Sequence, residues 1–213
     1  MDLRIFAYRP FVMGCIVAFI YGTAMFGSTY LLPVFMQMGL GMSASYAGNL
    51  LLPAGLVLGI TIPLVGRMAD TQPTHWLVCI GMALLALSFG LMLWAGPSTA
   101  LWVLASFIVI GRIGLGFILP SLNLGALRPL ERALITQGSS TISFIRMLGG
   151  AIGVGLCGIV LEWRLAVYAS DATRSAIDAR MAAFHESFVM LTVLCLLAFV
   201  AATQLRPAPK TET

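Results

Sequence analysis

The chain has 213 residues, of which 60% are hydrophobic and only 9% are charged. A soluble domain carries about a quarter of charged residues, so this composition excludes an ordinary water-soluble globular protein and indicates that lipid surrounds much of the chain. The net charge of +4 comes from 12 Lys and Arg residues that are spread between apolar segments, which argues against nucleic-acid binding.

Six segments are long and apolar enough to cross a bilayer, because a helix needs about 20 residues to span roughly 30 Å of hydrocarbon. They are predicted, in chain order, at residues 11–35, 46–65, 76–95, 100–122, 139–161 and 187–205. The first is predicted as a span and not as a signal peptide, because its apolar run is long and no cleavage pattern follows it. The predicted fold is an all-α polytopic membrane protein with a single six-helix transmembrane domain.

The loop charges predict the orientation of this domain. With six spans, both termini lie on one side of the membrane. That side holds seven cations, namely Arg4, Arg9, Arg67, Arg128, Arg132, Arg206 and Lys210. The other side holds three, Arg164, Arg174 and Arg180, so the positive-inside rule predicts that both termini are cytoplasmic.

Polar and aromatic side chains in the first two spans are candidates for a substrate pathway. They are Tyr21, Phe26, Tyr30 and Gln37 in and just after the first span, and Asn49 in the second. Aromatic surfaces suit lipophilic or cationic organic ligands, because a ring face attracts cations. The alternative interpretation is that these side chains face lipid or pack against other helices.

A short turn with an acid beside a base is predicted after the second span, at Gly66, Arg67 and Asp70. Asp70 is expected to cap the next helix or to pair with Arg67. Such a turn is either part of a cytoplasmic gate or an ordinary helix cap.

Arg112, in the middle of the fourth span, is the most informative residue of the chain. A charge at that depth costs several kcal/mol unless it faces protein or water. The neighbouring glycines Gly111, Gly114 and Gly116 allow a helix or a substrate to approach closely. Two interpretations are open, a role in the transport pathway and a purely structural role in helix packing. Asn123, near the end of this span, is a further pathway candidate.

The fifth span combines an arginine with a run of glycines. Arg146 is a pathway candidate, although it lies close enough to the cytoplasmic end to reach the interface. Gly149, Gly150 and Gly153 have the small-residue spacing that is typical of close helix contacts, so packing is predicted and bending is the alternative.

The third and sixth spans are the most uniformly apolar, while the others contain polar residues, glycine or proline. This grouping of three plus three suggests two inverted three-helix repeats, with the last helix of each facing lipid.

Enzyme chemistry is not indicated. The four cysteines lie in separate apolar segments, and the two histidines are predicted at opposite membrane faces, so no metal site is expected. The sequence contains no metalloprotease, hydrolase or phosphate-loop motif and no paired carboxylates inside a span. We therefore expect neither enzymatic activity nor a cofactor.

Several segments resemble one known family. The segments DLRIFAYRPF, YLLPVFMQMGLGMSASYAGNLLLPAGL, GRMAD, GRIGLGFILPSLNLGAL, QGSS and IRMLGGAIGVGL occur in the same order as in its members. The family is the fourteen-helix EmrB/QacA branch of drug:proton antiporters in the major facilitator superfamily, and the chain resembles its last six helices. The basic run that usually follows the Asp of GRMAD is replaced by TQPTH, which weakens a gating role for that turn.

The resemblance implies one half of a multi-pass transporter in the cell inner membrane that exports lipophilic or cationic small molecules in exchange for protons. The acidic proton-handling residues of the family lie largely in its N-terminal half. The chain is therefore expected to need that half or a second copy of itself. The alternative is a truncated membrane remnant or an interaction subunit that does not transport.

Overall fold

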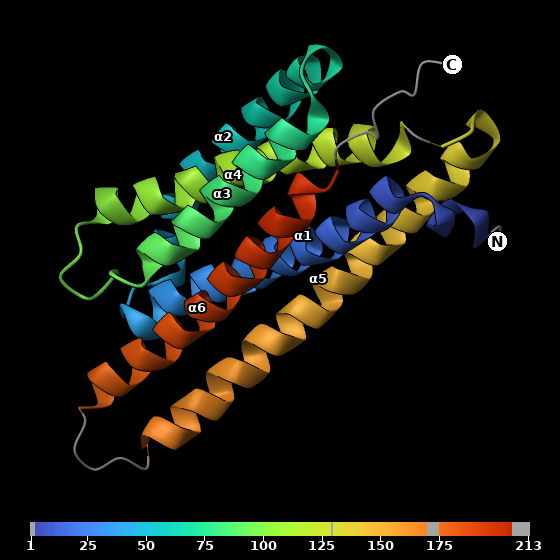
Figure 1. Cartoon of the computed structure of the whole chain (residues 1–213). Coiled ribbons are helices and arrows are strands. Elements are labelled where there is room, and N and C mark those ends of the chain that lie inside the picture. Colours follow the sequence, from blue (N-terminus) through green and yellow to red (C-terminus); the bar gives the residue numbers. More distant parts are fainter. Residues whose placement is uncertain (1–2, 129, 170–174, 206–213) are drawn as a thin grey trace.

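The computed structural model describes residues 3–128, 130–169 and 175–205. Six α-helices in this part of the chain are long and apolar enough to cross a membrane (Figure 1). They are α1 (Arg9–Val34), α2 (Ala44–Thr71), α3 (Thr74–Met92), α4 (Leu101–Leu127), α5 (Arg132–Ala169) and α6 (Ala176–Thr203). A short 3₁₀ helix, η1 (Leu3–Ala7), precedes α1, and a π-helical turn, η2 (Phe35–Gly39), continues it.

Five of these helices are longer than the predicted apolar segments, because their ends extend into polar sequence, whereas α3 ends at Met92, before the predicted end at residue 95. Pro33, Pro53, Pro63 and Pro120 all lie inside continuous helices. In lipid a helix continues through proline, since neighbouring groups satisfy the freed carbonyl and leaving the helical state would expose more backbone.

The turn predicted at Gly66, Arg67 and Asp70 is wrong, because these residues form the last turns of α2. A glycine by itself does not end a helix. Pro73 does, since proline disfavours the helical conformation of the residue before it, and Gln72 is extended with φ −100° and ψ 154°.

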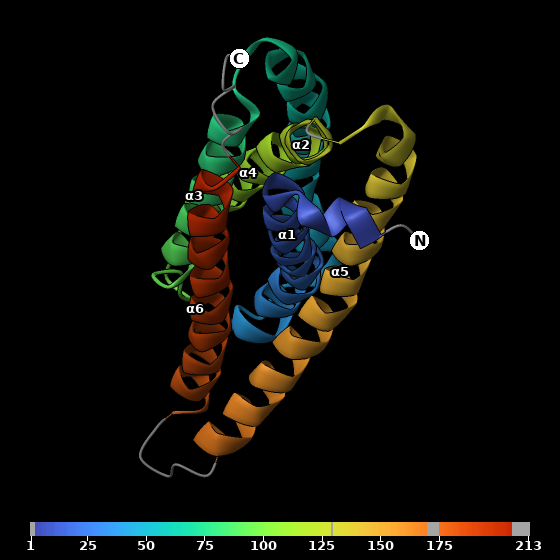
Figure 2. The ribbon, with the colours of Figure 1, turned by 45° about the vertical axis from the view of Figure 1, so that its right-hand side comes forward.

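The six helices form two groups of three around a central pair. α1 packs against α5 and α6, α4 packs against α2 and α3, and α1 also touches α4. Exchanging the first three helices for the last three maps each of these contacts onto another, as two inverted repeats require. Figure 2 shows α1 between α5 and α6.

The chain enters α1 and leaves α6 on the same side of this domain, as an even number of spans requires (Figure 1). Three cations that contribute to the predicted orientation, Arg174, Arg206 and Lys210, lie outside the described residues.

The backbones of α1 and α5 lie in direct contact at glycines. A Cβ atom on Gly22 would lie 2.0 Å from the carbonyl oxygen of Arg146, and one on Gly149 would lie 2.1 Å from that of Phe19. Thr23 Oγ1 donates a hydrogen bond of 2.9 Å to the carbonyl oxygen of Gly149. Any larger residue at these glycines would push the helices apart, so the glycines fix the separation and rotation of α5 relative to α1.

The glycines of α4 allow α3 and α2 to pack closely against it in the same way. A Cβ on Gly114 would lie 2.7 Å from the carbonyl oxygen of Gly81 in α3, whereas one on Gly116 would lie 2.6 Å from Thr61 Cγ2 in α2. Ser88 Oγ adds a hydrogen bond of 2.6 Å to the carbonyl oxygen of Phe107 between α3 and α4. These contacts settle which side of α4 faces which helix, and hence where Arg112 lies.

We predict that Gly153→Ala lowers the free energy of unfolding by about 1–3 kcal/mol, the range expected for an overpacked contact. The new Cβ would lie 2.6 Å from Thr23 Cα and 2.7 Å from its carbonyl oxygen. Thermal unfolding of the detergent-purified protein measures the effect.

Gly155→Ala is the matched control, because it lies on the same helix and a Cβ there meets nothing within 4 Å. Both substitutions gain the same helix propensity, so the control is expected to be neutral or slightly stabilising. Equal thermal stability of the two variants would contradict close packing at Gly153.

Candidate functional site

Three of the predicted pathway residues meet in the interior of the domain. Tyr21 of α1 is only 2% exposed, and its phenol lies within electrostatic range of both Arg112 of α4 and Arg146 of α5. The close contact between Gly22 and the backbone of Arg146 carries Arg146 to this place. Residues 125 positions apart in the chain therefore form one polar centre on the two central helices and α5.

This centre carries two positive charges and no described acid to balance them. In the described part of the chain neither Arg112 nor Arg146 forms an ion pair with an Asp or Glu side chain. Two partly buried guanidinium groups inside an apolar domain favour an anion or a carboxylate nearby, because an unbalanced charge there is costly.

Arg112 lies beside a narrow cavity between α1, α3 and α4. Ser28, Ser88 and Phe89 contribute to its lining, and its volume is about 10 Å³. That is enough for one water molecule at most, since a water needs about 10–15 Å³. The described chain thus places Arg112 at a polar point of the interior but encloses no substrate-sized space beside it.

The other predicted pathway residues are more dispersed. Phe26 packs its ring on Gly150 of α5, and the hydroxyl of Tyr30 lies 3.8 Å from the Cβ position of Gly158. Gln37 is exposed in η2, Asn49 is exposed on α2, and Asn123 is exposed near the end of α4. Phe26 and Tyr30 therefore share the α1–α5 side with the polar centre, whereas Asn49 and Asn123 lie near opposite ends of the domain.

The contacts expected of Asp70 are absent from the described residues. Asp70 forms no ion pair with Arg67, and α3 begins after Pro73 without a side-chain cap. The reason is the extra length of α2, because Asp70 belongs to that helix and not to a turn that faces the start of α3.

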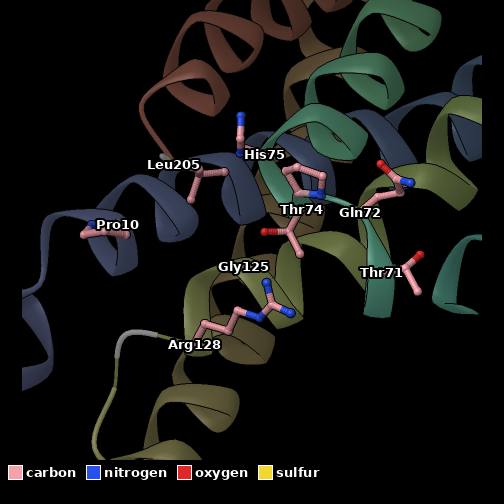
Figure 3. Close-up of a pocket in the computed structure, with 9 residues that line it drawn as sticks. Pro10, Thr71, Gln72, Thr74, His75, Gly125, Arg128 and Leu205 are labelled. Atoms are coloured by element: carbon pink, nitrogen blue, oxygen red, sulfur yellow. The ribbon is translucent and has the colours of Figure 1, made fainter. Parts of the chain in front are cut away.

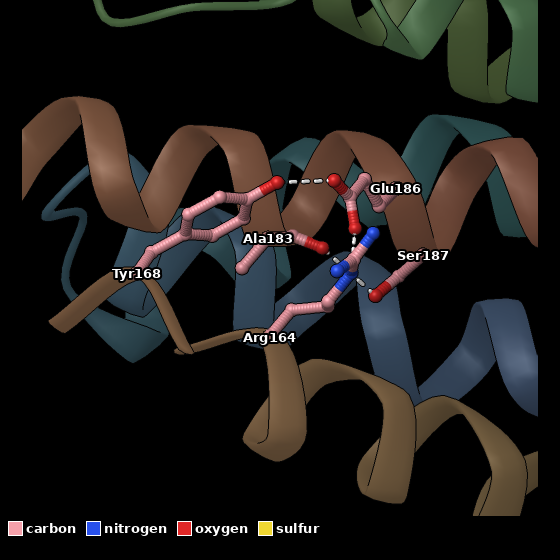
Figure 4. A network of polar contacts seen from close by, with 5 residues as sticks. All are labelled: Arg164, Tyr168, Ala183, Glu186 and Ser187. Atoms are coloured by element: carbon pink, nitrogen blue, oxygen red, sulfur yellow. Dashed lines mark hydrogen bonds and ion pairs between the residues drawn. The ribbon is translucent and has the colours of Figure 1, made fainter. Parts of the chain in front are cut away.

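A tie between α5 and α6 at the end of the domain opposite to the first residues of α1 was not predicted from the sequence. Arg164 of α5 forms an ion pair with Glu186 of α6, and the hydroxyl of Tyr168 donates a hydrogen bond to the same carboxylate (Figure 4). The guanidinium of Arg164 also lies 4.9 Å from the ring centre of Trp163. The sequence predicts Arg164 on the same side as several acids, among them Glu162 and Glu186, but it does not indicate which acid Arg164 contacts.

Two further contacts anchor α6 at this end. His185 Nε2 lies 2.9 Å from the carbonyl oxygen of Ala95, after α3, and Arg180 donates a hydrogen bond of 3.3 Å to the carbonyl oxygen of Met38 in η2. The first three turns of α6 therefore contact both η2 and the segment after α3 on this side of the domain.

No group of three or more metal-binding side chains occurs within the described ranges, and Cys15, Cys79, Cys157 and Cys195 are all buried and form no disulfide there. The chemistry of this domain thus lies in its charges and polar contacts.

The helix arrangement and the ordered sequence both match one family. A model of the Major Facilitator Superfamily matches residues 2–154, which is more than half of the chain. The chain belongs to the Major Facilitator Superfamily. This assignment agrees with the six helices and groups the chain with transporters and not with enzymes.

Two curated relatives illustrate the similarity. The lincomycin resistance protein LmrB of Bacillus subtilis (strain 168) is 26% identical over 211 residues, which are 95% of this chain and 43% of LmrB. The multidrug resistance protein B homolog of Mycobacterium tuberculosis (strain ATCC 25618 / H37Rv) is 28% identical over 166 residues, 77% of this chain and 31% of the relative. The chain spans less than half the length of both relatives.

A solved structure confirms the superfamily fold. A bacterial homolog of the human lysosomal transporter Spinster, in an inward-facing and occupied conformation, superimposes with a TM-score of 0.79 at 15% identity. The match covers 97% of this chain and 52% of that transporter. The inverted repeats inferred from the helix contacts are therefore those of the superfamily fold.

We predict that Glu186→Ala destabilises the domain by about 1 kcal/mol, since it removes a partly exposed ion pair and a hydrogen bond together. Thermal unfolding of the purified protein measures this difference. Glu162→Ala is the control, because Glu162 is an exposed acid on the same side that has no ion pair among the described residues. An equal effect of both substitutions would show that the tie between α5 and α6 contributes nothing to stability.

Proposed function

We propose that the chain is the C-terminal six-helix half of an exporter of lipophilic or cationic small molecules. It works together with a complementary N-terminal half in the cell inner membrane, with both termini cytoplasmic. The observation that carries this proposal is the polar centre of Tyr21, Arg112 and Arg146, whose two cations have no acid to balance them in the described chain.

The volume beside Arg112 supports the need for a second half. Sites for small molecules have volumes of about 300–1,000 Å³, and the cavity at Arg112 holds at most one water. In a transporter built from two such halves, the substrate site lies between them. The polar centre then forms one wall of that site.

The surface of α2 supports the same arrangement. Among the six described helices, α2 has the smallest share of buried residues in its most apolar stretch. A Cβ atom added at Gly48, Gly55 or Gly59 of α2 would meet no atom within 4 Å. At Gly22, Gly149 and Gly153, by contrast, it would meet the backbone of the neighbouring helix. Glycine lowers the stability of a helix, and close contact with another helix offsets this destabilisation. A helix of the partner half is therefore expected to pack on α2.

Proton coupling assigns a further role to the partner. A proton carrier in a membrane pathway needs an ionisable group, commonly a carboxylate, and no described Asp or Glu pairs with Arg112 or Arg146 in the polar centre. The acid that exchanges protons therefore belongs to the N-terminal half, where it also balances Arg112 or Arg146.

The relatives carry names for lincomycin and multidrug resistance, which supports a small amphipathic molecule as the substrate class. The aromatic rings of Phe26 and Tyr30 beside the polar centre suit such molecules, because they offer flat apolar surface.

Arg112→Ala is expected to abolish export while the protein still inserts into the membrane. The measurement is the accumulation of ethidium and lincomycin in cells that express this chain together with its N-terminal half. Arg132→Ala is the control, because Arg132 is an exposed arginine at the cytoplasmic start of α5.

Three comparisons decide the outcome. Export that needs both halves and is lost in Arg112→Ala but kept in Arg132→Ala supports the proposal. Export by the chain alone would indicate that two copies of it form the pathway. Unchanged accumulation with and without both halves would contradict export and favour a membrane subunit that does not transport.

A further inference from the structure

A cavity of about 410 Å³ lies at the end of the domain where the chain enters α1 and leaves α6. Its walls come from four segments, with Pro10 at the start of α1, Gln72 and Thr74 around the start of α3, Arg128 at the end of α4, and Leu205 after α6. The loop charges predict that this side is cytoplasmic. The cavity is separate from Tyr21, Arg112 and Arg146, none of which lines it.

The polar groups of this cavity are suited to an anion. Arg128 extends from the end of α4 towards Thr74 (Figure 3). Its guanidinium carries five N–H donors and forms no ion pair in the described part of the chain. The described lining residues include no Asp or Glu, so the charge of Arg128 is not neutralised inside the cavity.

Thr74 is a second, independent indication of a ligand. Its side chain is only 7% exposed, its hydroxyl points into the cavity, and it forms no hydrogen bond with any described residue (Figure 3). The hydroxyl oxygen is therefore open to the cavity, where a bound group can become its hydrogen-bond partner. Thr74 is also the first residue of α3, whose N-terminus has no side-chain cap, and the start of a helix favours a bound anion.

Gly125 keeps this hydroxyl accessible. A Cβ atom at that position would lie 2.8 Å from Thr74 Oγ1. Pro10 and Leu205 provide an apolar border on the side of the chain ends. The site thus joins a cationic and hydrogen-bonding floor to an apolar edge.

We propose that this cavity binds a phosphate group, held by Arg128, Thr74 and the start of α3. Basic pockets between transmembrane helices on the cytoplasmic side bind the headgroups of anionic lipids, and the apolar edge suits the glycerol end of such a lipid. Free phosphate offers the same chemistry, so the experiment separates the two sources. The proposal does not depend on export.

The experiment uses native mass spectrometry on the full chain in detergent, titrated separately with dioleoylphosphatidylglycerol, with dioleoylglycerol and with inorganic phosphate. Dioleoylglycerol has the same acyl chains without the phosphate. Arg128→Gln and Thr74→Val each remove one proposed contact. Arg132→Gln is the control, because this exposed arginine lies nearby in the sequence and does not line the cavity.

We expect phosphatidylglycerol to be retained in preference to dioleoylglycerol, and Arg128→Gln to weaken retention roughly tenfold, as for a lost hydrogen bond to a charged group. Thr74→Val is expected to weaken it less, and Arg132→Gln not at all. Retention of inorganic phosphate alone, with the same dependence on Arg128, would assign the site to soluble phosphate. Equal retention by all variants, or of both lipids, would overturn the proposal.

Discussion

The direct contact of the α1 and α5 backbones is the constraint on which the interior of this domain depends. Two helices in lipid gain little from burying apolar side chains, so they associate where small residues let their backbones touch. Gly22 and Gly149 provide this contact, and it places Arg146 beside Tyr21. The polar centre is therefore a consequence of helix packing, and a bulkier residue at these glycines would displace charges as well as helices.

The distribution of charge is the basis for the proposal that this chain works together with a second half. The interior holds Arg112 and Arg146, and neither forms an ion pair with a described acid. A pathway that moves protons requires a group that binds and releases them, usually an acid. The polar centre of this chain contains the cations Arg112 and Arg146 and no described acid paired with them. Under the proposed function the partner half supplies the acid, which makes its assembly with this chain electrostatically favourable.

The sequence predicted the parts of the structure that stand out against an apolar background. Six spans follow from hydropathy, and Arg112 is conspicuous because a mid-span charge is costly. The end of α2 was not predicted, because Gly66 suggested a turn and the effect of Pro73 on Gln72 decides the helix end. The cavity at Arg128 was not predicted either, because ordinary residues from four distant segments form it only after folding.

Accessibility of position 112 to water tests the account most directly. The chain carrying Arg112→Cys, with its four native cysteines replaced by alanine, is expressed together with the N-terminal half and treated with a membrane-impermeant thiol reagent. The account predicts labelling at position 112 and none for Leu197→Cys, since Leu197 is an apolar side chain that is 58% exposed on α6 and is expected to lie against lipid. Absence of labelling at position 112, with the complex assembled, would show that Arg112 serves helix packing and that the proposed pathway does not pass it.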